Sequence, residues 1–284
     1  MGIDKDAAKF LLSARERKVN FQKTLMLGNQ LFEVPRSDYK ILTDTFKLKD
    51  LGRVKTSNDF FHLLGAEEVS AMDISDYEGA TILHDLNQPI GDELKEKFTF
   101  VLDGGTLEHV FNFPNALSNA MKMVKVGGHL VIITGGNNFL GHGFYQFSPE
   151  LFYRALSEEN GFAVNRLVAA EVRGNWYEAA DPQQIKGRVE LINDKQVYLM
   201  VLAEKRASKP LFVNVPQQSD YVAMWHDTND AQKNSGSSNK IKNLLKKNEF
   251  VYRTLVQIKQ KQLDNALRKE KSFANSKVYK LVDK

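Results

Sequence analysis

The stretch FTFVLDGGTLEHV, from Phe98 to Val110, indicates how the rest of the chain is built. Its first half is a short apolar run, typical of a strand that is buried on both faces, and the run ends at Asp103-Gly104-Gly105. A fifth run follows in GGHLVIIT, and three earlier apolar runs end at Gly28, Asp73 and Asp85. Helical patterns separate most of these runs. The sequence therefore predicts a doubly wound, mainly parallel α/β sheet.

Two later apolar runs, FAVNRLVAAEV and QVYLMVLAEK, have no crossover helix between them. Such runs are typical of neighbouring antiparallel strands, which need no crossover. Before them, Ser148 and Pro149 indicate a helix start, because Ser is a common N-cap and Pro is tolerated at the first helical position. Together with an amphipathic N-terminal helix over residues 1–20, these runs predict one α/β domain over residues 1–205, closed by an antiparallel strand.

Charge is unevenly distributed along the chain. From Ala231 onward there are 14 Lys and Arg against 4 Asp and Glu, so the remainder is acidic although the whole chain has a net charge of +4. We expect an irregular linker over residues 206–239 and a basic amphipathic helical tail over residues 240–284. The tail could pack on its own domain, bind a protein partner or attach to an anionic surface. It shows no strong nucleic-acid signal, because its basic positions lack an interleaved aromatic stacking platform.

Composition excludes several classes of site. The chain has no cysteine, which rules out disulfides, thiolate catalysis and Cys-based zinc sites. No apolar stretch approaches the roughly 18 residues of a membrane span, and the start has no secretory apolar region, so we expect a cytoplasmic protein without a transmembrane segment. The six histidines show no metal-ligand spacing, so the sequence predicts no metal site.

The stretch VIITGGNNFLGHGF, from Val131 to Phe144, has some of the glycines of a dinucleotide-binding turn. That turn needs its last glycine to open a helix, because the pyrophosphate lies on the helix N-terminus. Here Gly141 is followed by HGFYQF, and the next helix signal is Ser148-Pro149. We therefore interpret this stretch as a glycine-bent loop after the fifth strand, at the edge of the sheet where α/β proteins bind ligands.

The strand ends suit S-adenosylmethionine. Its ribose diol needs a carboxylate that accepts two hydrogen bonds, and Asp73 ends the second strand. Its adenine needs an apolar slot with one polar group, and its methionine moiety needs backbone without side chains, which Gly28 and Gly104 offer.

Four motifs, LHDLNQP, VLDGGTLEHVFN, KVGGHLVIIT and HGFYQFSPELF, resemble class I S-adenosylmethionine-dependent methyltransferases. The resemblance covers roughly Lys23 to Lys205, and the closing antiparallel pair is typical of that family rather than of nicotinamide-dependent Rossmann enzymes. It implies S-adenosyl-L-methionine as the cofactor. The cofactor-binding residues implied at the strand ends are Asp73 at the ribose, Asp85 and Leu86 at the adenine, and Gly104, Gly105, Thr106 and Glu108 beside the methionine and the methyl group. Ile74, which follows Asp73, is a further cofactor-binding candidate.

The first-strand turn departs from the family pattern ExGxGxG, since it reads LMLGNQLFEVP. The cofactor carries no phosphate, so a full phosphate cradle is not required. Asn29 and Gln30 could bind the methionine carboxylate or amine through their amides, with Gly28 beside them. A second interpretation is a non-catalytic methyltransferase-like binding or assembly module whose altered turn no longer holds the cofactor.

The candidate catalytic residues are His109, His142 and Tyr145. Histidine is the side chain best suited to remove a proton near neutral pH, and His142 and Tyr145 lie in the loop after the fifth strand, where acceptors enter. Nucleobase-amine methyltransferases carry an Asn/Asp-Pro-Pro-Tyr stretch after the fourth strand, whereas this chain has DGGT. We therefore expect oxygen methylation of a small-molecule acceptor, a sugar or another small polar metabolite.

Overall fold

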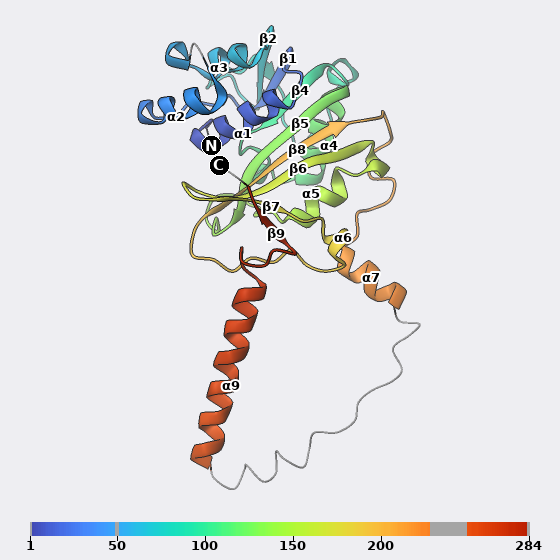
Figure 1. Ribbon diagram of the computed structural model, residues 1–284. Coiled ribbons are helices and arrows are strands. Elements are labelled where there is room, and N and C mark those ends of the chain that lie inside the picture. The colour runs from blue at the N-terminus through green and yellow to red at the C-terminus, as the bar shows by residue number, and fades with distance from the viewer. Residues whose placement is uncertain (1, 49–50, 228–248, 283–284) are drawn as a thin grey trace.

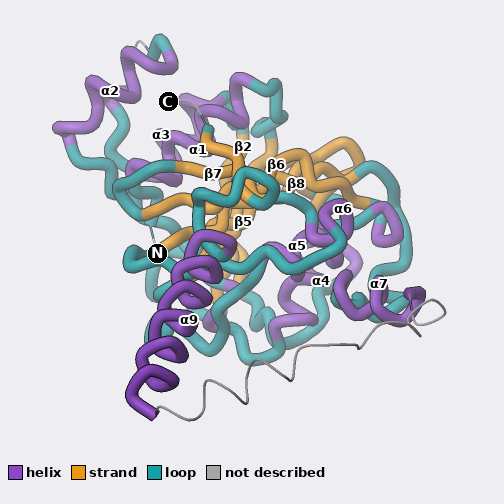
Figure 2. Tube along the Cα trace, turned by 60° about the horizontal axis from the view of Figure 1, so that its bottom comes forward, coloured by secondary structure: helices purple, strands orange, loops and turns teal. Residues whose placement is uncertain are grey.

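The protein is built around one mixed β-sheet. The computed structural model describes residues 2–48, 51–227 and 249–282, and within these residues the strand order is β3-β2-β1-β4-β5-β8-β6-β7-β9. Figure 1 shows this sheet with helices on both sides, and Figure 2 shows the strands passing through the centre of the molecule. The prediction of a doubly wound α/β fold is confirmed.

Five parallel strands form one half of the sheet. They are β1 (Lys23–Leu27), β2 (Glu68–Asp73), β3 (Ile82–Leu83), β4 (Phe98–Asp103) and β5 (Val124–Asn137). The chain runs outward from β1 to β3 and then returns to β4 on the other side of β1. The strand order therefore reverses between β1 and β4, and the crevice at the carboxyl ends of such strands is where open α/β sheets bind ligands.

Antiparallel strands form the other half. Strand β8 (Val197–Lys205) lies between β5 and β6 (Phe162–Glu171) and is antiparallel to both, which confirms the predicted antiparallel pair. Strand β7 (Trp176–Ala179) pairs with β6, and β9 (Tyr279–Leu281) pairs with β7 at the edge. The sequence predicted neither of these two edge strands.

Helices cover both faces of the sheet. Successive side chains along a strand point to opposite faces and pack against these helices. One face carries α1 (Lys5–Glu16), α2 (Arg36–Phe46) and α3 (Ser57–Leu64), and the other carries α4 (Phe113–Met123) and α5 (Pro149–Ala155). In β1, Leu25 and Leu27 belong to the core that includes α4 and α5, whereas Met26 between them belongs to the core that includes α1 and α3. This period of two is expected for a strand that is buried on both faces.

Short helical segments complete the described structure. Four are single 3₁₀ turns, at Leu51–Arg53, Asp92–Leu94, Leu107–His109 (η3) and Glu158–Asn160. Two are short α-helices, α6 (Pro182–Ile185) and α7 (Ser219–Asp227), and residues 206–218 between β8 and α7 contain neither helix nor strand.

Two features of the N-terminal half, a helix and a helix cap, were not predicted from the sequence. Helix α2 lies in the interval before α3, where the sequence predicted no element. The N-cap of α3 is Thr56, because the Thr56 hydroxyl accepts from the Asp59 backbone N–H (3.1 Å) while the Asp59 carboxylate accepts from the Thr56 N–H (3.0 Å). This reciprocal capping box satisfies two backbone donors, whereas a single cap would satisfy only one of them.

The basic tail is only partly described. Residues 228–248, which include the last part of the predicted linker (206–239) and the first part of the predicted tail (240–284), lie outside the described residues. Helix α9 (Glu249–Glu270) extends away from the sheet, and every side chain from 260 to 270 is exposed (Figure 1). Among the described residues, none of the helices is both long enough and apolar enough to cross a membrane.

The end of the tail belongs to the sheet. Strand β9 covers the edge of β7, Val278 and Tyr279 are buried, and the Phe273 ring stacks on Tyr177 with ring centres 3.9 Å apart. The expectation that the sheet is complete by Lys205 is therefore wrong. The physical reason is that β7 would otherwise present an unpaired edge.

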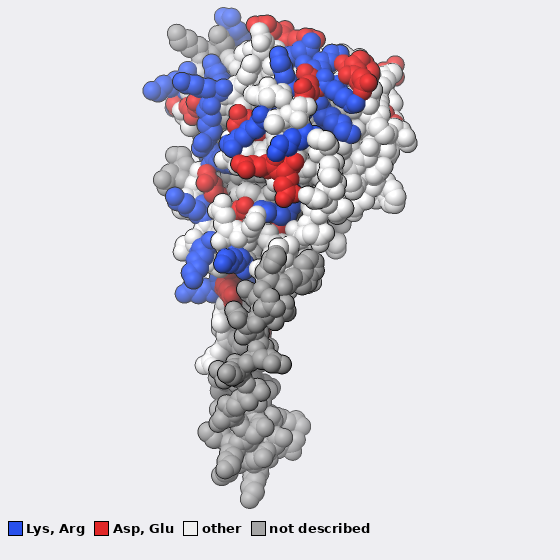
Figure 3. Space-filling view, turned by 90° about the vertical axis from the view of Figure 1, so that its right-hand side faces the viewer, with Lys and Arg blue, Asp and Glu red and all other residues white. Residues whose placement is uncertain are grey.

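Acidic and basic side chains are mixed on the face of the molecule shown in Figure 3. Ion pairs between opposite charges occur in the described residues, for example between Lys23 of β1 and Glu68 of β2 (2.9 Å) and between Arg206 and Glu204 at the end of β8 (3.6 Å). A phosphate backbone is held by a continuous basic surface, which this face does not present.

Candidate functional site

The turn after β1 is held by a compact hydrogen-bond network. Gly28 has a φ of +70°, and a Cβ atom there would lie 2.8 Å from the Thr106 hydroxyl, so only glycine fits. The Leu27 carbonyl accepts from the Thr106 hydroxyl (2.7 Å) and from the Gln30 amide (2.9 Å). The network joins the carboxyl ends of β1 and β4 at the point where the strand order reverses.

The Gln30 side chain lies in the space between Gly28 and Gly104. A Cβ atom on Gly104 would lie 2.7 Å from the Gln30 Oε1, and Gln30 itself is buried. Its Oε1 has no hydrogen-bond partner among the described residues. The neighbouring Asn29 donates its amide to the Glu78 carbonyl in the loop between β2 and β3. Asn29 and Gln30 were the two side-chain amides predicted to bind the cofactor. Gln30 has an acceptor oxygen without a described partner at the turn, whereas the Asn29 Nδ2 already donates a hydrogen bond to Glu78.

Asp103 ends β4 and is fully buried. One carboxylate oxygen accepts from the backbone N–H groups of Thr106 (2.9 Å) and Leu107 (3.1 Å), while Oδ2 has no partner in the described structure. Burial, together with the negative charge of Glu108, raises the pKa of Asp103 well above its usual range. Gly105 follows at a φ of +93°, which allows the backbone to turn sharply into η3.

The ends of β2 and β3 lie at the same edge, with Asp73 opposite Leu83 in the register. Asp73 is half-buried, and its Oδ1 accepts from the Ile74 N–H (2.6 Å). The Ile74 side chain is 68% exposed, so an apolar surface borders the carboxylate. This arrangement leaves the predicted ribose partner accessible at the expected strand end.

Asp85 and Leu86 are arranged differently from the sequence expectation. The Asp85 carboxylate accepts from both the backbone N–H (2.9 Å) and the side-chain amide (2.8 Å) of Asn87, and these bonds lower its pKa. The Leu86 side chain is buried in the core. Asp85 therefore stabilises a turn with one oxygen, as Asp commonly does after a strand.

The loop after β5 folds back onto Glu108. The Glu108 carbonyl accepts from the N–H groups of Phe144 (2.9 Å) and Tyr145 (3.2 Å), and a Cβ atom on Gly143 would lie 2.8 Å from that same oxygen. The loop contains no helix before α5, as the sequence predicted when it excluded a dinucleotide turn. Glycine at 143 is therefore required for close packing on η3.

This folding brings the three candidate catalytic side chains to one region. The His109 and His142 rings lie 5.0 Å apart, and the Tyr145 hydroxyl donates to the Phe111 carbonyl (2.7 Å). His109 is exposed in part, and the desolvation of its packed side, followed by the nearby His142, lowers its pKa, although the negative charge of Glu108 opposes this shift. Tyr145 thus anchors the loop, and the two histidines are the groups available for proton transfer.

Sequence reasoning missed several residues at this edge. Asp103 was recognised only as a strand end, although its position as the last residue of an apolar run was the available signal. The exposed rings of Phe111 and Phe144 lie 5.8 Å apart in an edge-to-face arrangement beside the histidines. No local pattern indicated that pair, because it forms only when the loop after β5 meets the end of η3.

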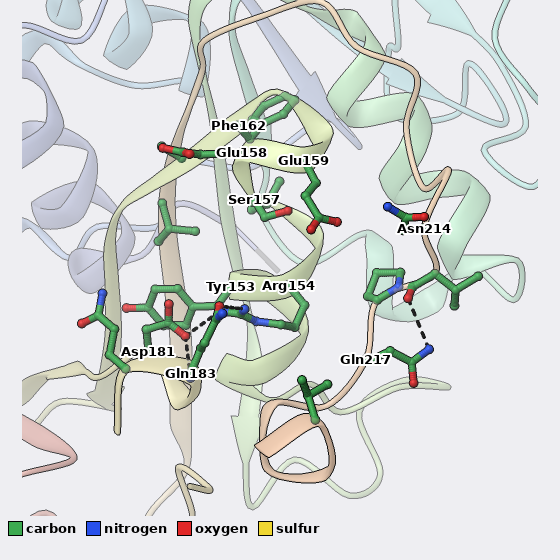
Figure 4. A pocket seen from close by; sticks show the side chains of 17 residues that line it. Tyr153, Arg154, Ser157, Glu158, Glu159, Phe162, Asp181, Gln183, Asn214 and Gln217 are labelled. Carbon is green, nitrogen blue, oxygen red and sulfur yellow. Dashed lines mark hydrogen bonds and ion pairs between the residues drawn. The ribbon is translucent and has the colours of Figure 1, made fainter. Parts of the chain in front are cut away.

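A groove of about 680 Å³ lies elsewhere, between α5, β6, α6 and residues 214–217 (Figure 4). Its polar side chains pair with one another. Arg154 forms an ion pair with Asp181 (2.6 Å) and a hydrogen bond with Gln183, and the Tyr153 hydroxyl donates to the Ala179 carbonyl (2.8 Å). None of the predicted site residues lines it, so this groove is separate from the site at the reversal point.

Neither family models nor curated protein sequences match this chain. Solved structures do resemble it. TehB from Haemophilus influenzae is 14% identical with a TM-score of 0.39, and the match covers 69% of this chain and 62% of TehB. The N-methyltransferase NodS from Bradyrhizobium japonicum, in complex with S-adenosyl-L-homocysteine, is 13% identical with a TM-score of 0.42, over 72% of this chain and 87% of NodS.

A third similar structure is the branched-chain polyamine synthase from Thermus thermophilus, which is 12% identical with a TM-score of 0.39, over 75% of this chain and 59% of the synthase. Similarity at this level concerns the arrangement of the sheet and carries no information about the substrate. The strand order, with antiparallel β8 inserted between β5 and β6, defines a doubly wound, Rossmann-like α/β fold in this chain.

Proposed function

We propose that this protein is an S-adenosyl-L-methionine-dependent methyltransferase that methylates an oxygen atom of a small polar acceptor, such as a sugar. The observation that carries the proposal is a pair of buried acceptor oxygens without partners, Gln30 Oε1 and Asp103 Oδ2, beside the glycines at the reversal point. Buried acceptors of this kind favour a ligand that brings donors or positive charge.

The residues at this edge fit the cofactor. Gln30 and Asp103 would accept from its ammonium group, Asp73 would accept from the ribose diol, and the exposed Ile74 would lie against the adenine. When bound, the cofactor supplies a methyl carbon that is activated by its sulfonium. The protein then has to orient the acceptor, exclude water and remove a proton.

The acceptor would enter between η3 and the loop after β5. His109, whose pKa is lowered by the desolvation of its packed side, is neutral near pH 7 and can take the hydroxyl proton of the acceptor. The exposed rings of Phe111 and Phe144 offer an apolar surface for the face of a small ring-shaped acceptor. A sugar combines such a face with hydroxyl groups, which supports oxygen methylation.

One observation favours a second candidate, a non-catalytic methyltransferase-like module. The buried Gln30 side chain fills the space beside Gly28 and Gly104, where the methionine moiety would need close approach to the backbone. In this alternative, Gln30 replaces the ligand instead of binding it.

Calorimetric titration of the full chain with S-adenosylmethionine and with S-adenosylhomocysteine tests the proposal. We expect saturable binding of both compounds, one per chain. Absence of binding of either compound at millimolar concentration would support the non-catalytic module.

A Gln30→Ala variant separates the two candidates further. If Gln30 binds the cofactor, its loss weakens affinity, because one acceptor is removed. If Gln30 blocks the turn, its loss creates space, and affinity appears or increases. Asn29→Ala is the matched control, since the Asn29 amide is engaged with Glu78.

A further inference from the structure

Three potential metal ligands lie together at the acceptor side of the site. Glu108 and His109 are in η3, and His142 is in the loop after β5. One ligand atom from each residue lies within 4.8 Å of those from the other two. His109 and His142 are separated by 33 positions in the chain, so the spacing of histidines in the sequence gave no signal for this cluster.

The carboxylate of Glu108 is buried without a hydrogen bond in the described structure, and its charged neighbour is His142, 3.5 Å away, which carries charge only when protonated. Glu108 is 1% exposed, and neither of its oxygens has a hydrogen bond among the described residues. A buried carboxylate without a hydrogen-bonding or charged partner is costly. A cation between Glu108 and the two imidazoles would remove that cost.

The distance between Glu108 and His142 suits a shared ion better than a direct bond. Their closest atoms, Oε1 and Nε2, are 3.5 Å apart, which is longer than a normal hydrogen bond. The Nε2 atom is also buried without a hydrogen-bond partner. Two ligands that bind one tetrahedral ion at about 2.0–2.1 Å each are separated by roughly 3.3 Å.

The backbone holds the cluster in place. The carbonyl of Glu108 binds the N–H groups of Phe144 and Tyr145, and the His109 N–H donates to the Thr106 carbonyl (3.0 Å). The His109 ring is exposed and the His142 side chain is 32% exposed, so ring rotation can close the remaining separation and an ion can enter from solvent.

We infer that Glu108, His109 and His142 bind a divalent first-row transition-metal ion. Two imidazoles and one carboxylate suit zinc, iron or cobalt better than calcium or magnesium, which prefer oxygen ligands. Three protein ligands would leave a position open for an oxygen atom of the acceptor. An ion there would lower the pKa of the acceptor hydroxyl, so that in the ion-bound protein His109 would act as a ligand and solvent would take the proton. The role of the ion in catalysis rests on the proposed function, whereas its binding does not.

Titration with Co²⁺ tests the inference, because its visible absorption changes when nitrogen ligands enter its coordination shell. The full chain without an affinity tag would be treated with a chelator, dialysed and titrated, with Zn²⁺ added afterwards as a competitor. We expect one Co²⁺ per chain, displaced by Zn²⁺. Glu108→Gln and His142→Ala should each weaken Co²⁺ binding at least tenfold.

His62→Ala is the matched control, because this histidine is in α3 and its ring binds the Ala66 carbonyl (2.8 Å). It should leave Co²⁺ binding unchanged. If a variant does not fold, as judged by its thermal melt, the exposed His109→Ala replaces it. Absence of saturable Co²⁺ binding, or equal binding in wild type and in the folded ligand variants, would overturn the site.

A parallel titration with S-adenosylmethionine keeps the two proposals distinguishable. Binding of Co²⁺ without binding of S-adenosylmethionine supports the metal site and contradicts the methyltransferase proposal. The opposite result overturns the metal site and leaves the proposed function standing.

Discussion

At the residue scale, Asp103 combines a structural and a binding role in one carboxylate. Its Oδ1 satisfies two backbone donors that begin η3, while the buried Oδ2 has no partner. An unpaired buried acceptor reduces stability, and proteins tolerate it where a ligand later supplies the missing donor. Asp103 should therefore reduce the stability of the free protein while contributing to ligand affinity.

Asp103→Asn tests this directly. Asn keeps an oxygen for the two backbone donors and removes the buried charge, so we expect a gain of about 1–3 kcal/mol in the free energy of unfolding near neutral pH. Because the folded-state pKa of Asp103 is raised, its ionisation costs stability as pH rises from about 4 through that folded pKa. The advantage of the variant should increase across this window.

Urea unfolding at several pH values measures this effect, with the exposed Asp76→Asn as the control. S-adenosylmethionine should bind the Asp103→Asn variant more weakly than wild type. Equal stability of the variant and wild type at all pH values would contradict the assignment of Asp103 as an unpaired buried carboxyl.

Asp73 is the residue that the ribose assignment depends on. Asp73→Ala removes charge-assisted hydrogen bonds to a diol, so we expect S-adenosylmethionine affinity to fall at least about tenfold, or roughly 1.4 kcal/mol. Calorimetry measures the change, and Asp76→Ala, in the exposed turn three residues later, should have no effect. Unchanged affinity in Asp73→Ala would exclude the diol contact.

At the element scale, the parallel strands could be predicted from local sequence patterns. Strand pairing between distant parts of the chain could not. Apolar runs that stop at Gly28, Asp73 and Asp103 mark strand ends, because a buried strand must exclude polar residues until the chain leaves the sheet. Strand β9 carried no such signal. It is three residues long, and Leu281 pairs with Tyr177, more than a hundred positions earlier.

The same limit applies to the candidate site. His109, His142 and Tyr145 could be named from their positions after strands, since the carboxyl edge is common to all parallel strands. Their mutual proximity depends on the loop that packs Gly143 against Glu108, which no sequence period encodes. The burial of Gln30 between two glycines is likewise a consequence of how β1 and β4 approach each other.

Strand β9 should contribute measurably to stability. Tyr279 is 4% exposed and packs near Phe273, with ring centres 5.0 Å apart, whereas the adjacent Lys280 is exposed. Replacing a buried aromatic ring with alanine costs about 3 kcal/mol. We expect Tyr279→Ala to lower the Tm by several degrees and Lys280→Ala to leave it nearly unchanged. Equal melting temperatures for the two variants would show that β9 does not pack on the domain in solution.

At the scale of the whole molecule, the chain returns to its domain after leaving it. Residues 228–270 lie between α7, which follows the sheet, and residues 271–282, which rejoin it through Phe273 and β9. The exposed side chains at 260–270 do not contribute to the core, whereas the residues after them do. The exposed side chains at 260–270 are thus the described part of the tail that can contact an anionic surface or a protein partner.

Two deletion variants separate these roles. One ends at residue 227, and the other replaces residues 228–270 with a Gly/Ser linker and keeps residues 271–284. Because only the first loses β9 and Phe273, we expect it to melt at a lower temperature, while the second melts like wild type. Calorimetric melts measure the difference.

The linker variant also reverses the charge of the protein. Residues 228–270 hold 10 Lys and Arg against 4 Asp and Glu, so their removal changes the formal net charge from +4 to −2. If this segment binds anionic surfaces, the full chain should associate with phosphatidylserine-containing vesicles at low salt and dissociate as salt rises, because exposed charges are screened beyond about 10 Å at 0.1 M. The linker variant should not associate at any salt concentration. Vesicle binding that survives in this variant, or that is insensitive to salt in the full chain, would assign the contact to the folded domain instead of the basic tail.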